Sequence, residues 1–98
     1  MEGQVDVVDA FSTVGRIDQY DLLVLKDDKR FFPLYDAAFL IRNPVVEKYP
    51  AVREALEELA GKISNEEMRR LNFRVTHKKR PERDVAREFL VSKGLFSE

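Results

Sequence analysis

"GQVDVVDAFSTVGRIDQYDLLVLKDDKRFFPLYDAAFLIR", residues 3–42, is the stretch that decides the fold expected for this chain. Residues 4–12 are rich in β-branched side chains, which are enriched in strands. Residues 22–25, LLVL, form the compact apolar run that is typical of a strand buried on both faces. Residues 31–42 also look extended, and Pro33 belongs at the edge or the start of a strand because it has no amide N–H. The pattern therefore predicts three short strands.

The chain between the first strand and residue 61 carries turn and helix signals. One helical turn is expected across residues 16–20. Asn43 and Pro44 form an N-cap and N1 pair that opens a short helix. Pro50 opens another helix, whose apolar side chains recur at helical spacing until Gly61 ends it.

Two further helices are expected in the last third of the chain. Ser64 and Glu67 have the spacing of a capping box in front of a helix over residues 65–73. Pro81 opens the last helix and Gly94 stops it. Short strands followed by about four helices indicate an α/β fold, because helices with apolar stripes need a sheet or other helices to cover.

Composition sets the class of protein. With 98 residues, the chain is one small domain or a piece of a larger one. Apolar residues make up 44% and charged residues 36%, which is ordinary for a globular protein and argues against disorder. No apolar run approaches the length of a membrane span, and the first residues lack the basic and apolar regions of a secretory signal. The absence of cysteine excludes disulfides, thiolate metal sites and cysteine nucleophiles.

The residues that usually carry catalysis are missing. His77 is the only histidine, and the sequence has no Gly-rich phosphate loop, nucleophile elbow or paired metal-binding histidines. Asp27 and Asp28 are neighbours on a turn and are expected to point apart. We therefore expect no enzyme, no cofactor and no metal site. The basic stretch 77–83 could contact phosphates, but the net charge of −1 and the lack of a recognition helix make nucleic acid a weak alternative.

The ordered series of residues in 3–42 resembles the late part of the substrate-binding proteins of ABC transporters for osmoprotectants. The family pattern is roughly G-x-I-D-V-x-x-A-Y-S-T-D-G-R-I, then L-x-x-L-x-D-D-K, then F-F-P-P-Y-x-A-A-P. Residues 59–75 and 84–96 also resemble the closing helices of that family. The positions that carry the series here are Gly3, Asp6, Ala10, Ser12, Thr13, Gly15, Arg16, Ile17, Leu22, Leu25, Asp27, Asp28, Lys29, Phe31, Phe32, Pro33, Tyr35, Ala37 and Ala38.

The resemblance implies a partial lobe of a type II periplasmic-binding-protein fold. Such proteins have two α/β lobes with the ligand between them. Residues 1–98 would be the C-terminal portion of the binding domain, with a hinge crossing near residues 22–42 and a helical remainder over residues 43–95. The chain would then be a fragment, a truncated homologue or a domain divided between chains. The implied partners are an ABC permease subunit and the missing remainder of the two-lobed domain, and the implied location of the parent protein is extracytoplasmic.

The implied ligand is a quaternary ammonium compound such as glycine betaine or choline. Because this cation has no N–H to donate, aromatic faces select it through cation–π attraction. The resemblance places two cage positions at Phe11 and Tyr35. Three substitutions depart from the family pattern: Val14 replaces an acidic residue, and Leu34 and Phe39 each replace a proline.

A second hypothesis is an interaction or oligomerisation module that keeps the architecture without the ligand. The short length and the residues at positions 14 and 34 favour it. Exposed edges and uncovered helix faces would then promote self-association of the isolated chain.

Overall fold

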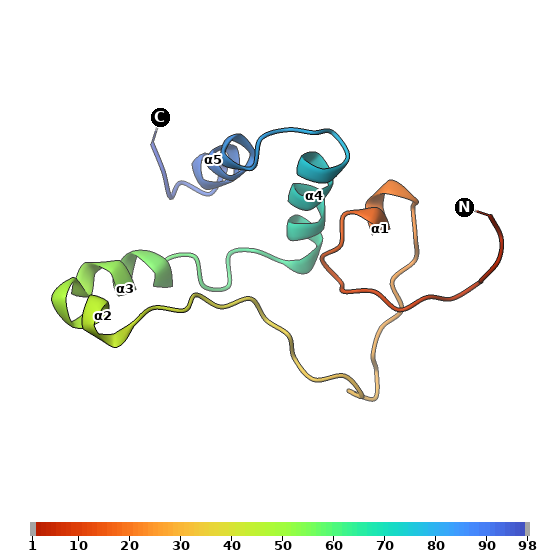
Figure 1. Cartoon of the computed structure of the whole chain (residues 1–98), viewed down its shortest axis with the longest axis horizontal. Coiled ribbons are helices and arrows are strands. Elements are labelled where there is room, and N and C mark those ends of the chain that lie inside the picture. Colours follow the sequence, from red (N-terminus) through yellow and green to blue (C-terminus); the bar gives the residue numbers. More distant parts are fainter. Residues whose placement is uncertain (1, 98) are drawn as a thin grey trace.

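The computed structural model describes residues 2–97, which form helices joined by long extended connections (Figure 1). One helical group, α2 with α3, lies at one end of the molecule, and α1, α4 and α5 form a second group. The elements in chain order are α1 (Arg16–Gln19), α2 (Asn43–Lys48), α3 (Pro50–Glu57), α4 (Asn65–Thr76) and α5 (Glu82–Ser92).

The predicted α/β fold with short strands is wrong. None of the described residues 2–97 belongs to a strand, and the segments 4–12, 22–25 and 31–42 run as unpaired extended chain (Figure 1). Burial of the run 22–25 on both faces is wrong as well, since Leu23 is 86% exposed. A strand requires a ladder of backbone hydrogen bonds to a neighbouring strand, and no backbone hydrogen bond joins these segments to one another in the described chain.

The helix signals of the last third are confirmed. The Ser64 hydroxyl accepts from the Glu67 amide at 3.1 Å, and the Glu67 carboxylate accepts from the Ser64 amide at 3.0 Å, so the predicted capping box is present. The helix α4 continues to Thr76, three residues beyond the expected end. The helix α5 is followed by Gly94 with a φ of +71°, the left-handed conformation expected of a helix-stopping glycine.

The start of α2 differs by one residue from the prediction. Asn43 is the first helical residue rather than the N-cap, a position that Arg42 occupies without a side-chain capping bond. Pro44 lies in the first turn, where its missing N–H has no helical partner to lose. Pro50 opens α3 as predicted, and the helix ends at Glu57, four residues before Gly61.

The core of the described chain lies within the group of α1, α4 and α5. Ile17 of α1 and Val85 of α5 are the buried hydrophobic side chains, at 8% and 2% exposure. Ion pairs join α4 to α5, because Arg74 pairs with Glu88 and Lys93 pairs with Glu67 at 2.5 Å. Since α1 and α5 each contact α4 but not each other within the described residues, this group is held by two separate small apolar contacts with α4 and by charged side chains at its surface.

Candidate functional site

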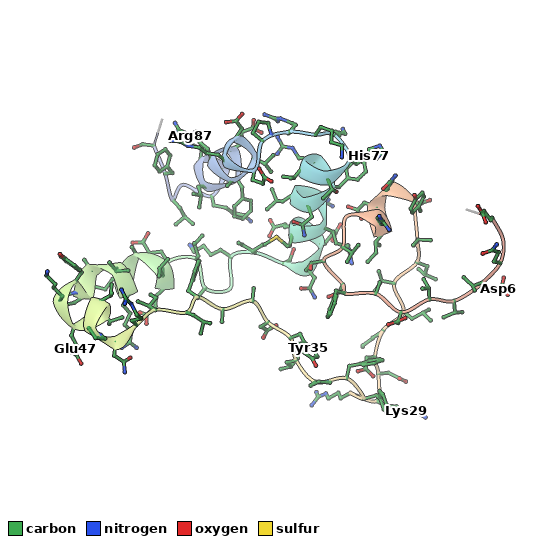
Figure 2. The ribbon with its side chains drawn as sticks, viewed as in Figure 1. Asp6, Lys29, Tyr35, Glu47, His77 and Arg87 are labelled. Carbon is green, nitrogen blue, oxygen red and sulfur yellow. The ribbon has the colours of Figure 1, made fainter. Side chains whose placement is uncertain are left out.

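The two predicted cage residues lie close together. The ring centroids of Phe11 and Tyr35 are 6.4 Å apart and their planes meet at 75°. Both rings are more than two-thirds exposed, and each comes from a different extended segment; Figure 2 shows Tyr35 on the connection that leads to α2. The chain therefore brings together two aromatic rings that are 24 positions apart (35 − 11) in the sequence.

The geometry of this pair limits where a cation could lie. A cation midway between the centroids would be 3.2 Å (half of 6.4 Å) from each, closer than the roughly 3.5–4.0 Å of carbon–carbon contact. A trimethylammonium group therefore does not fit between the rings. It would lie beside both, within the roughly 6 Å of each centroid at which cation–π attraction acts. The pair can supply two walls of a cage at nearly a right angle.

The segment after Phe11 is tied to α4. The Phe11 carbonyl accepts from the Val14 amide at 3.1 Å, and this hydrogen bond closes a turn over residues 11–14. The Ser12 carbonyl accepts from Arg69 Nη1 at 3.2 Å, and the Thr13 carbonyl accepts from Asn72 Nδ2 at 2.7 Å. Two side chains of one helix thus hold the turn that begins at Phe11.

The segment before Tyr35 is shaped by a capped turn. The Asp27 carboxylate accepts from the amides of Phe31 at 3.0 Å and Phe32 at 2.9 Å. These two hydrogen bonds, that from Phe32 foremost, lower the pKa of the Asp27 carboxyl below its ordinary value. Arg30 adopts a φ of +51° at this turn. The Phe31 and Phe32 rings pack edge to face at 5.1 Å, so they form an aromatic contact separate from that of Tyr35.

A surface groove of about 380 Å³ lies between α4 and α5, away from the aromatic pair. Its apolar part comes from Leu71 and Phe89. The charged side chains at its rim are paired, Lys93 with Glu67 and Arg74 with Glu88. The groove is thus the surface of the contact between α4 and α5, and the ion pairs across it belong to that contact.

Other chemistry is not assembled in residues 2–97. The described residues hold no group of three or more side chains suited to bind a metal ion. His77, the only histidine, stacks on Phe73 at 4.9 Å between ring centroids, which is a packing role. Within the same range, none of the helices has the length and apolar character needed to cross a membrane.

Arg69 and Asn72 were not predicted from the sequence. They bond to carbonyls that lie 57 and 59 positions away along the chain. The only local signal was their spacing of three residues, which places both on one helix face. That spacing is common on any helix, so it could not identify the turn they hold.

A known protein family and several known proteins match most of this chain. Residues 1–92 match the family described as the substrate binding domain of ABC-type glycine betaine transport system. The carnitine transport binding protein of Listeria monocytogenes is 44% identical over 93 residues, which cover 95% of this chain and 30% of that protein. The ergothioneine transport permease/ergothioneine binding protein of Helicobacter pylori is 42% identical over 92 residues, 94% of this chain and 17% of that protein.

A third relative is more distant. The glycine-betaine-binding protein of Pseudomonas aeruginosa is 34% identical over 87 residues, 89% of this chain and 28% of that protein. The chain therefore spans no more than about a third of the length of these three relatives.

Proposed function

Because the chain belongs to the family of substrate-binding domains of ABC-type glycine betaine transport systems, we propose that it forms part of the ligand site of an importer for quaternary ammonium osmoprotectants. The role is to bind a solute and present it to a permease subunit outside the cytoplasm, without catalysis. The observation that carries the proposal is the approach of Phe11 and Tyr35 to 6.4 Å, two exposed rings in the arrangement of cage walls.

The names of the relatives narrow the ligand class. They name carnitine, ergothioneine and glycine betaine. Each of these molecules carries a trimethylammonium group and a carboxylate, whereas choline carries a hydroxyl in place of the carboxylate. We therefore assign a trimethylammonium carboxylate as the preferred ligand, and choline as a weaker one.

Phe11 and Tyr35 supply only part of the required binding energy. One exposed aromatic ring contributes roughly 0.5–1 kcal/mol to cation binding, and the contribution reaches about 2 kcal/mol only when water is excluded. Both rings are open to solvent in this chain. The remainder of a two-lobed domain would have to cover the cation, so the 98-residue chain alone should show no measurable binding at micromolar ligand.

A graft tests the function. The segment of the Listeria monocytogenes carnitine protein that matches this chain is replaced by this chain, and the product is called the graft. Titration calorimetry with carnitine, glycine betaine and choline should show binding of the two carboxylate ligands and weaker binding of choline. The unaltered Listeria protein, which should bind carnitine under the same conditions, is the control. If the graft folds but binds none of the three ligands, the proposal is contradicted.

The interaction module remains a second candidate because of one observation. The extended segments expose many large apolar side chains, among them Leu23, Leu25, Phe31 and Leu40. Such surface favours contact with another polypeptide, either the remainder of the domain or a second copy. This candidate predicts self-association of the isolated chain whether or not an osmolyte is present.

A further inference from the structure

We propose that Arg69 and Asn72 of α4 are positioning residues for Phe11, and that the closing helices thereby set the geometry of the ligand cage. The inference rests on the proposed function, since it assigns Phe11 to the cage. Neither residue is expected to touch the ligand. They act on the backbone of the turn that carries the ring.

The hydrogen bonds identify the two residues. Asn72 donates to the Thr13 carbonyl at 2.7 Å and Arg69 to the Ser12 carbonyl at 3.2 Å. These carbonyls are adjacent, and they follow Phe11 directly. Because the Val14 amide also binds the Phe11 carbonyl at 3.1 Å, the turn is held both internally and from the helix. The position of the Phe11 Cα atom relative to α4 is thereby fixed.

The surroundings of Arg69 support a specific role. Its side chain is only 17% exposed, and its Nε atom is buried without a hydrogen-bond acceptor in the described structure. The carboxylate of Asp18 lies 3.7 Å from that Nε atom, close enough for attraction but too far for a hydrogen bond. A largely buried guanidinium with an unpaired N–H carries a free-energy cost of desolvation. A surface arginine that faces solvent does not carry this cost. Arg69 thus joins the turn and α1 to one point on α4.

The support continues into α5. Glu67 caps the start of α4 and also pairs at 2.5 Å with Lys93, the C-cap residue of α5. Two residues beyond Asn72, Arg74 binds Glu88 of α5, which also binds Arg80 in the connection between the two helices. The position of α4, and through it that of Phe11, is therefore tied to the last helix of the chain. Tyr35, in contrast, lies in the segment 31–40, where every side chain is exposed.

The first test needs no ligand. The chain has no tryptophan, so Phe11→Trp introduces a unique fluorophore at the cage position. In that background, Asn72→Leu and Arg69→Met should increase acrylamide quenching and lower the anisotropy of the indole. The control is Arg70→Met on the same helix, because Arg70 pairs with Glu66 and makes no bond to the turn. Helix content by circular dichroism should be the same in all variants.

The second test measures coupling in the graft. Asn72→Leu should weaken glycine betaine binding about 2- to 10-fold, the effect of one lost hydrogen bond on the wall it supports. In a Phe11→Ala background, Asn72→Leu should have no further effect, because there is no ring left to position. Asn72→Gln, which keeps an amide donor, should recover part of the affinity.

The outcomes separate the two proposals. Quenching unchanged by Asn72→Leu in both the chain and the graft, or additive effects of Asn72→Leu and Phe11→Ala, would overturn the positioning role while leaving osmolyte binding intact. A graft that binds no osmolyte, although quenching responds to Asn72→Leu, would overturn the ligand assignment and leave the support of the Phe11 turn by α4 standing.

Discussion

Gly15 lies where the start of α1 meets the backbone of α4. A Cβ atom at this position would lie 2.8 Å from the Phe73 amide nitrogen and 2.9 Å from its Cα, distances that require the backbone to move. The φ of Gly15 is −62°, a value open to any residue, so close approach rather than dihedral freedom requires glycine here. The same approach brings Ser12 and Thr13 within reach of Arg69 and Asn72.

Substitution of Gly15 tests this contact. Gly15→Ala should separate α1 from α4 and destabilise the group of α1, α4 and α5 by about 1–3 kcal/mol, the usual cost of overpacking. Urea unfolding followed by circular dichroism measures the change. Gln19→Ala on the exposed side of α1 is the control and should change stability little. Equal stability of Gly15→Ala and Gln19→Ala would show that α1 is not seated on α4 in solution.

At the residue scale, sequence reasoning reached only part of the site. It named Phe11 and Tyr35, whose role as cage walls stays a prediction. It missed Arg69 and Asn72, because their partners are backbone carbonyls nearly 60 positions away. A carbonyl acceptor leaves no trace in residue identity, so such a contact becomes visible only when the chain is folded.

At the element scale, Glu88 of α5 is one of two carboxylates whose ion pairs join α4 to α5, the other being Glu67. Hydrogen bonds from Arg80 and then Arg74 lower the pKa of its carboxyl from an ordinary 4.5 to about 2. A carboxyl whose pKa is lower in the folded than in the unfolded state stabilises the fold above its unfolded pKa. That stability is lost as the pH falls through the folded pKa. The stability that the Glu88 carboxylate contributes is therefore lost between about pH 4.5 and pH 2.

The pH dependence gives a direct prediction. The thermal unfolding midpoint of the helices should fall as the pH drops from 5 to 2. In the Glu88→Gln variant, which has no carboxyl at this position, the midpoint should fall less over the same pH range. Glu66→Gln is the control, because Glu66 pairs with Arg70 within α4 and joins no second helix. An identical pH profile for Glu88→Gln and the unaltered chain would contradict the role of this ion pair.

Helices and strands were not equally predictable, and the reason is physical. The start of α4 could be predicted because a capping box acts between residues three apart, and Gly94 acts locally in the same way. The strand over 22–25 was wrong because an apolar run specifies burial only when another element covers it. Leu23 and Leu25 find no such cover in the described chain. Helix signals between residues close in sequence held to within a few residues, whereas strand signals, which depend on distant partners, did not.

At the scale of the whole molecule, the chain exposes far more surface than a compact protein of its length. Its accessible area is 9162 Å², whereas a folded chain of this size exposes about 5,800 Å². Its radius of gyration is 16.9 Å, compared with about 13 Å for a compact domain of 100 residues. The excess of roughly 3,400 Å² lies on this one chain and exceeds the share of one partner in most obligate interfaces, which bury roughly 2,000–5,000 Å² summed over both partners.

This surface predicts the behaviour of the isolated chain. At high concentration it should self-associate through the exposed apolar side chains of segment 22–42, and light scattering should report a mass above that of the monomer. Leu23→Lys with Leu25→Lys should reduce the association, whereas Gln19→Lys, at an exposed polar position, should not. A compact monomer with a radius of gyration of about 13 Å would contradict the expectation.

The central claim is that Tyr35 and Phe11 form two walls of a quaternary ammonium site. Calorimetric titration of glycine betaine into the graft, with Tyr35→Ala and the matched control Phe31→Ala, tests it most directly. Phe31 is an equally exposed aromatic residue of the same segment, but it contacts Phe32 instead of the pair. Tyr35→Ala should weaken binding about 2- to 30-fold, the value of one cation–π contact, while Phe31→Ala should leave it nearly unchanged. Equal affinity of the Tyr35→Ala variant and the unaltered graft would contradict the claim.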